Sequence, residues 1–144
     1  MHNPNYIRKS VDQQIFDKVV KHLYTQNAQA KDKQYGSCKY REEETGLTCA
    51  VGCLISKQNY DARIEGSCGS SEDVIHTVKR SIRRAVSLRT PELLDALQTV
   101  HDDYFEDSTG FRDKTVYNQL LEVSVKFNLN TTKLDRVYKD VIAA

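Results

Sequence analysis

Apolar residues recur with the spacing of an α-helix along most of this sequence, and this pattern is the strongest constraint on its fold. After Ser10 they return every three or four residues, which places them on one face of a helix. Gln13 follows Ser10 at the spacing of a capping box, in which a serine and a glutamine satisfy the first backbone N–H groups of a helix. We therefore predict a first helix that begins at Ser10 and ends near Asn27.

Four further segments show the same period. The second should start after Ser70 or Ser71 and run to Val86, because apolar residues continue that far. The other three are expected to begin at Thr90 with Pro91 as first helical residue, after Gly110, and after Thr131. A chain of 144 residues is long enough to bury roughly 68–70% of its unfolded surface in one core. The prediction is a mainly α, compact single domain of about five amphipathic helices (residues 10–144), preceded by a loose arm (residues 1–9).

The stretch Cys38–Ile55 differs from the helical segments. Cys38–Arg41 is typical of a short strand, and Glu42–Gly46 of an acidic turn. Leu47–Ile55 is continuously apolar, which suits either a buried strand or a buried helix. A helix from Cys49 with Thr48 as its cap is slightly favoured. The whole stretch is expected to form a small cysteine-bearing β-hairpin or turn element.

The four cysteines have the spacing C-x10-C-x3-C-x14-C. Zinc sites usually use two closely spaced cysteine pairs, and here only the second and third cysteines are close. Core packing is therefore the preferred interpretation, since free cysteine behaves as a small apolar residue. The alternatives are a reactive thiol and a structural zinc ion. The zinc site would use all four cysteines: Cys38, Cys49, Cys53 and Cys68.

The charges nearly balance, with 21 Lys and Arg against 20 Asp and Glu. A net charge of +1 argues against binding of extended nucleic acid, so any anion site must be a local patch. No apolar run is long enough to span a bilayer and the first residues are polar, which indicates a cytoplasmic protein with reduced thiols and no membrane partner.

One local patch is basic. Lys79, Arg80, Arg83 and Arg84 fall within the second predicted helix, where residues four apart would form two cationic rows. Arginine forks bind phosphate oxygens in pairs, so this face is a candidate phosphate site. The charge balance itself favours the other interpretation, in which the acidic third helix packs beside this face and neutralises it.

Two tyrosines complete the candidate ligand site. Tyr40 and Tyr60 are expected to be exposed and to stack on the base of a nucleotide. No catalytic residue is assigned, because no sequence motif specifies a reaction.

Residues 13–66 resemble small proteins encoded by tailed phages and prophages. The likeness rests on Gln14–Val20 followed by His22-Leu23, on Cys38–Arg41, and on the run Gly46–Ile55 (G-L-T-C-A-V-G-C-L-I). The resemblance implies a viral setting, in the cytoplasm of an infected or lysogenic host cell. It also implies stoichiometric action against host machinery, and it transfers no site residue.

The expected function is that of a phage-type accessory protein, counter-defence-like, that sequesters a small phosphorylated or nucleotide-like host ligand through its arginines. The first alternative is an inhibitor that occupies a host protein with its acidic surface, Asp102–Asp107. The second is a cysteine-dependent enzyme, although the features lean away from catalysis. No cofactor is expected apart from the zinc alternative, and a homo-oligomer is compatible with all three.

Overall fold

The computed structural model describes residues 8–143 except 33, 35 and 104–109. Within these residues it contains five α-helices, which confirms the predicted mainly α fold. They are α1 (Val11–Gln26), α2 (Glu72–Ile82), α3 (Thr90–Asp102), α4 (Lys114–Lys126) and α5 (Thr132–Ala143). Three short 3₁₀ turns accompany them: Gly52–Leu54, Ala62–Ile64 and Gly110–Arg112. Most of the predicted N-terminal arm, residues 1–7, lies outside the described part.

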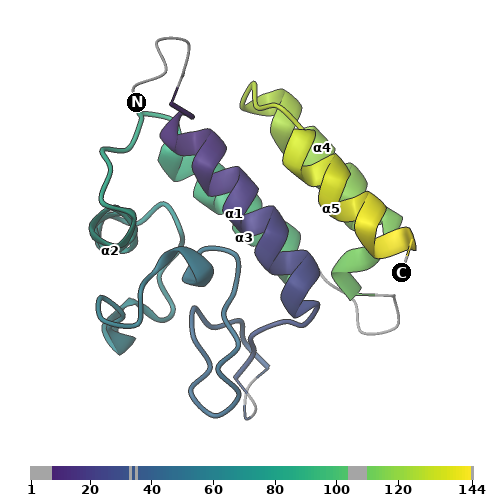
Figure 1. Ribbon diagram of the computed structural model, residues 1–144. Helices are drawn as coiled ribbons and strands as arrows, with labels where there is room; N and C mark the ends of the chain where they lie inside the picture. Colours follow the sequence, from purple (N-terminus) through teal and green to yellow (C-terminus); the bar gives the residue numbers. More distant parts are fainter. Residues whose placement is uncertain (1–7, 33, 35, 104–109, 144) are drawn as a thin grey trace, which may run out of the picture.

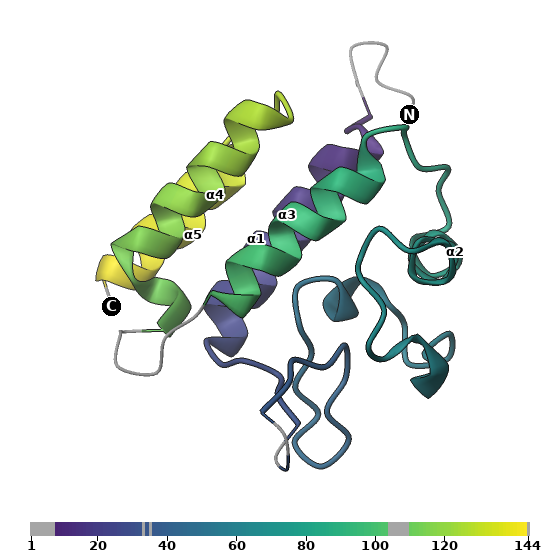
Figure 2. The ribbon, with the colours of Figure 1, turned by 180° about the vertical axis from the view of Figure 1, so that it is seen from behind.

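Four of the helices form one group, which we call the four-helix group. α1 and α3 lie side by side, and α4 and α5 form a second pair next to them (Figures 1 and 2). α1 packs on α5, and α3 packs on α4, so the two pairs share one core. α2 lies outside this group and crosses its direction, since both views show it end-on.

The first helix begins and ends where the sequence predicts. Ser10 is its N-cap and accepts a hydrogen bond from the Gln13 N–H at 3.1 Å. Asn27 ends it in the left-handed conformation, with its N–H bonded to the Leu23 carbonyl. The Gln13 side chain does not close the capping box. It exchanges hydrogen bonds with the backbone of Asn130 instead, and so ties α1 to the turn before α5.

The start of α3 is displaced by one residue from the prediction. Arg89, not Thr90, is the N-cap, and Thr90 is the first helical residue. The Thr90 side chain is fully buried, where it donates to Asp12 at 2.6 Å and accepts from the Ser87 N–H at 2.8 Å. This hydroxyl links α3 to α1 because a buried hydroxyl needs a partner.

The end of α2 also differs from the prediction. The helix stops at Ile82, and Arg83 takes a left-handed conformation (φ 56°) as its C-cap. Ala85 and Val86 therefore lie beyond the helix. The two predicted cationic rows do not form, because Arg83 and Arg84 no longer follow the helical spacing of Lys79 and Arg80.

The core lies between the helices of the four-helix group and extends under the loops. Burying one large apolar side chain contributes about 1.5–3 kcal/mol, so this core is the main source of stability. Its fully or almost fully buried members from the helices include Ile15, Phe16, Val19, Val20, Leu23, Leu93, Leu94, Leu97, Leu120 and Leu134. Ala50, Val51 and Leu54 add to it from outside the helices.

The connecting segment (residues 28–71) joins α1 to α2 and contains no β-strand among its described residues. The predicted hairpin is therefore not seen there. Two isolated antiparallel bridges form instead, Lys31–Cys38 and Arg41–Thr48. The favoured helix from Cys49 is also wrong, because only the 3₁₀ turn Gly52–Leu54 forms there. Thr48 takes part in a bridge rather than capping a helix.

Side-chain hydrogen bonds hold the connecting segment in place of a sheet. The Glu65 carboxylate accepts the N–H of Tyr40 at 2.8 Å, the N–H of Arg41 at 3.3 Å and the hydroxyl of Tyr60 at 2.6 Å. One carboxylate thus fixes two separate parts of the segment.

No helix in the described part of the chain combines the length and the apolar character needed to cross a membrane.

Candidate functional site

The predicted basic residues gather around one hollow, although they do not share a helix. Lys79, Arg80, Arg83 and Arg84 line a hollow of about 340 Å³ at the C-terminal end of α2, together with His76 and Ala85. We call this the cationic hollow. The structure therefore brings the four predicted residues together by a different geometry from the one expected.

Within the described residues, no carboxylate forms an ion pair with these four side chains. Arg84 donates to the Gln14 side chain at 2.8 Å, which leaves its charge without a counter-ion there. The neutralisation by the acidic third helix is not seen among the described residues, where Glu92 of α3 pairs with Arg89 instead; Glu106 and Asp107 lie outside the described part. The negative end of the α2 dipole favours cations here, but its partial charge of about half a unit cannot neutralise four positive side chains.

Arg83 takes a backbone conformation that usually belongs to glycine. A non-glycine residue with positive φ costs roughly 1–2 kcal/mol, and helix C-caps of this type are normally Gly or Asn. Here the strained residue is an arginine that lines the cationic hollow. Strained backbone is found preferentially at functional sites, which makes Arg83 a residue to test.

A second hollow, of about 450 Å³, lies against the cationic hollow. The two share His76 and Arg80 as wall residues. We call it the tyrosine hollow, because Tyr60 lines it; Asn59 and Asp73 are among its other, polar wall residues. Both hollows lie beside α2, at the edge of the connecting segment.

Of the two predicted stacking tyrosines, one lines this site. Tyr60 is half-buried, and the Arg41 guanidinium lies 5.4 Å from its ring centre. Burial, reinforced by the hydrogen bond to Glu65, raises the Tyr60 pKa, so its hydroxyl stays protonated. Tyr40 is 5% exposed and donates to the Ser67 carbonyl. Its expected exposure is wrong, because the ring is part of the core.

The cysteines do not assemble as the zinc alternative requires. Cys38, Cys49 and Cys68 line a third hollow of about 670 Å³, whereas Cys53 is not among its wall residues. The Cys53 thiol instead donates to the Ala50 carbonyl at 3.0 Å. A four-thiolate site is therefore not formed by the described residues.

Three of the thiols are poor nucleophiles. Burial raises the pKa of Cys53 to about 12, and burial followed by a hydrogen bond to Asp102 does the same for Cys38. Burial also raises the pKa of Cys49. Because the thiolate is the reactive form, these side chains do not favour a cysteine-dependent enzyme. Cys68 is exposed, with its sulfur 3.4 Å from the Ser70 hydroxyl.

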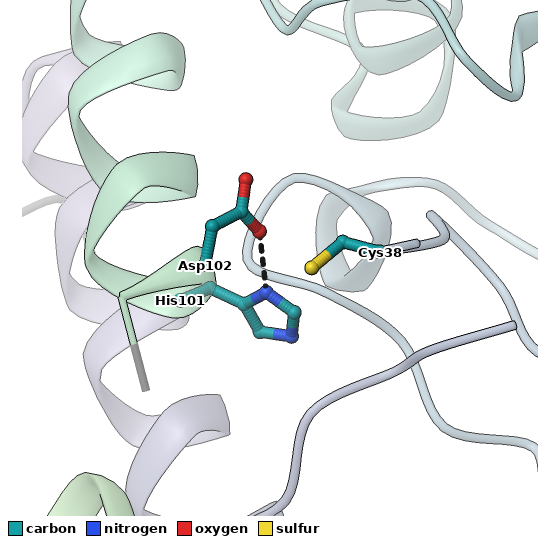
Figure 3. A group of neighbouring side chains, drawn as sticks. All are labelled: Cys38, His101 and Asp102. Carbon is teal, nitrogen blue, oxygen red and sulfur yellow. Dashed lines mark hydrogen bonds and ion pairs between the residues drawn. The ribbon is translucent and has the colours of Figure 1, made fainter. Parts of the chain in front are cut away.

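The structure assembles one cluster that the sequence analysis missed. Cys38, from the connecting segment, meets His101 and Asp102 at the end of α3 (Figure 3). Their sulfur, ring nitrogen and carboxylate oxygen lie within 4.8 Å of one another. The neighbouring His101 and Asp102 are visible in the sequence, but nothing there indicates that a distant cysteine packs against them.

The acidic surface of the inhibitor alternative is only partly described, since residues 104–109 lie outside the described part. Asp102 accepts hydrogen bonds from His101 at 2.9 Å and from Gln98 at 2.8 Å. This carboxylate is therefore engaged within the protein.

No known protein family, curated protein or solved structure matches this chain. Its function must be argued from its own residues.

Proposed function

We propose that this protein binds a small phosphorylated, nucleotide-like ligand across the cationic and tyrosine hollows and performs no chemistry on it. The observation that carries the proposal is the shared wall at Arg80 and His76, which joins a group of uncompensated cations to an aromatic, polar pocket. A nucleotide has the same two parts, an anionic phosphate and a flat base with polar edges.

The charges suit the phosphate end of such a ligand. Lys79, Arg80 and Arg83 are exposed and have no ion-pair partner among the described residues, so binding need not break an existing pair. Hydrogen bonds to charged groups contribute about 1.5–3 kcal/mol each, more than neutral ones. Arg80 can serve both hollows because it lines each of them.

The other hollow suits the base and sugar. Tyr60 offers an aromatic ring, and base–aromatic stacking contributes about 1–3 kcal/mol. Asn59 and Gln58 supply amide groups for the polar edge of a base, and the Asp73 carboxylate can accept from a sugar hydroxyl or an exocyclic amine.

The resemblance to phage accessory proteins suggests that the ligand belongs to an infected host cell. Such a protein, present in excess, would lower the free concentration of a host signalling nucleotide by binding it. Stoichiometric sequestration requires affinity but no catalytic group, which fits the protonated state of Cys38, Cys49 and Cys53.

The test is a thermal-shift and calorimetric panel of mononucleotides, cyclic nucleotides and ADP-ribose derivatives. We expect a rise in Tm with at least one of them, and a loss of about tenfold or more in affinity for Arg80→Ala or Arg84→Ala. Cys53→Ser is the control and should bind normally. If no member of the panel changes the Tm, the proposal is wrong.

Arg83→Gly separates function from folding. Glycine relieves the left-handed backbone, so the variant should be as stable as the wild type or more so, yet bind the ligand more weakly. The matched control is Asn128→Gly, which makes the same backbone change at a positive φ of 53° after α4. Equal binding by Arg83→Gly and wild type would exclude Arg83 as a ligand contact.

A further inference from the structure

The cluster of Cys38, His101 and Asp102 is independent of the two hollows beside α2. It lies at the junction of the connecting segment and α3, and the hollow that Cys38 and Asp102 line shares no wall residue with the other two. Figure 3 shows the cysteine sulfur pointing toward the histidine and aspartate side chains. His101 and Asp102 are neighbours at the end of α3, whereas Cys38 comes from the connecting segment, so only the tertiary fold adds the cysteine to this pair.

The hydrogen bonds of the cluster define where its protons lie. His101 is fully buried; its Nε2 accepts the Ala30 N–H at 3.3 Å, and its Nδ1 lies 2.9 Å from Asp102 Oδ1. The ring proton is therefore on Nδ1 and is donated to Asp102. The Cys38 thiol donates to the same carboxylate. Two protons of the cluster thus converge on Asp102, which also accepts from the Gln98 amide.

These three groups are ligands that one metal ion prefers. A thiolate, an imidazole nitrogen and a carboxylate oxygen are the standard ligands of zinc, and zinc sites with three protein ligands leave the fourth position to water or substrate. An ion placed between the three would replace both converging protons with bonds to the same atoms.

The neighbouring hollow gives such an ion an entry path. Its volume is about 670 Å³, and Cys49, Cys68 and Asp95 line it together with Cys38 and Asp102. Thiols and carboxylates in one concave surface favour a thiophilic divalent cation over an anion or an apolar molecule.

We propose that Cys38 Sγ, His101 Nδ1 and Asp102 form a binding site for a thiophilic divalent metal ion of the zinc type. On binding, the Cys38 S–H bond breaks and its proton goes to solvent while sulfur bonds the metal. The Nδ1 proton of His101 moves to Nε2, so the ring stays neutral and the nitrogen lone pair bonds the metal. Asp102 is already ionised. The balance is one proton released for each ion bound.

The new proton on Nε2 has a consequence. Nε2 can then no longer accept the Ala30 N–H, so that hydrogen bond is lost. With three protein ligands and one broken hydrogen bond, binding should be weaker than in closed four-ligand zinc sites, with a Kd above roughly 10⁻⁷ M.

The experiment uses the full chain, freed of metal with a chelator under reducing conditions and titrated with Co²⁺ and Zn²⁺. We expect a thiolate-to-cobalt absorption band, a stoichiometry of one, and release of one proton, measured by calorimetry in buffers of different ionisation heat. Cys38→Ser should remove the band, and Asp102→Asn should weaken binding about tenfold or more. Cys53→Ser, whose thiol bonds to Ala50 away from the hollow, should bind as the wild type does.

Backbone NMR of the wild type provides a readout that needs no variant. Zinc should shift the Ala30 amide resonance and speed its hydrogen exchange, because that N–H loses its acceptor. The proposal is overturned if no thiolate band appears, if no proton is released, or if Cys38→Ser retains the band while Cys49→Ser or Cys68→Ser removes it. A variant that circular dichroism shows to be unfolded is replaced by Cys38→Ala, and the wild-type NMR result stands by itself.

Discussion

The four-helix group and the connecting segment are stabilised in different ways. In the four-helix group, apolar side chains from α1, α3, α4 and α5 meet in a shared core. The connecting segment has only isolated bridges and 3₁₀ turns in its described part, and polar side chains such as Glu65 hold it. Two of the three hollows with candidate ligand groups are lined in part by this segment, and the third, the cationic hollow, shares wall residues with one of them.

This difference suggests that the four-helix group mainly supplies stability and that the loops supply polar groups. Helices satisfy their own backbone groups, so their surfaces need few polar contacts. Loops must satisfy backbone groups with side chains, which brings carboxylates, amides and thiols together inside the fold. The proposed binding groups lie at the ends of α2 and α3 and in the loops next to them, rather than in the middle of the four-helix group.

The largest effect should follow from a cavity in the four-helix group. Phe16→Ala removes a fully buried ring, and we expect the free energy of unfolding to fall by about 3–5 kcal/mol. Urea denaturation measures this. Val125→Ala, at a side chain that is 81% exposed, should change it by less than about 0.5 kcal/mol. Similar losses in both variants would contradict the assignment of the core.

Close backbone packing in the connecting segment gives the next largest effect. A Cβ on Gly52 would lie 1.9 Å from the Tyr40 carbonyl oxygen, so Gly52→Ala must displace the backbone. We expect a loss of about 1–3 kcal/mol in urea denaturation, as for other overpacked sites. Gly36→Ala is the control, because no atom lies within 4 Å of its Cβ position and only its φ of 69° opposes alanine. If Gly36→Ala lowered the free energy of unfolding more than Gly52→Ala does, the close contact between Gly52 and the Tyr40 carbonyl would be wrong.

Replacing Glu65 tests whether polar contacts hold the connecting segment. Glu65→Gln places an amide NH₂ against the hydrogen-bond donors Tyr40, Arg41 and Tyr60. We expect a loss of about 1–2 kcal/mol. Hydrogen exchange followed by mass spectrometry should show faster exchange in residues 38–67, with α1 unchanged. Uniform acceleration along the chain would mean that the two regions unfold as one unit.

The smallest effect is a pH dependence at the contact between α1 and the connecting segment. His22 Nε2 lies 3.0 Å from the Thr48 carbonyl, and burial lowers the His22 pKa despite that hydrogen bond. The unfolded chain therefore binds the proton more readily. The contribution of neutral His22 to the free energy of unfolding is complete above about pH 6.5, and it declines as the pH falls toward the pKa of His22 in the folded protein.

His22→Gln keeps a donor for the Thr48 carbonyl but cannot titrate. Urea denaturation at pH 7.5 and pH 5 should show a smaller loss of stability for His22→Gln than for the wild type. An equal loss in both proteins would show that other groups cause the pH dependence.

Local signals in the sequence predicted the helices well, for identifiable reasons. Ser10 and Ser71 cap their helices as expected because the capping hydrogen bond spans only three residues. The apolar period predicted the buried faces of α1 and α3. The end of α2 was wrong because apolar residues continue past Ile82, whereas the backbone turns at Arg83.

The candidate sites were predictable only in part. The four basic residues were identified from their proximity in sequence, but the hollow they line results from the turn at Arg83. Tyr60 and Tyr40 were indistinguishable by residue type. Tyr60 lines the tyrosine hollow and Tyr40 is buried in the core, and this difference depends on how the connecting segment packs.

The sequence by itself determined the mainly α class, the small net charge, and the starts of α1, α2, α3 and α5 to within about one residue, whereas α4, expected directly after Gly110, begins at Lys114 after a 3₁₀ turn. These depend on interactions between residues a few positions apart, which periodicity and capping patterns record. Only the tertiary structure decided that Cys38 meets His101 and Asp102, that Tyr40 is buried, and that two hollows share Arg80. Such contacts join residues far apart in the chain, and no local preference encodes them.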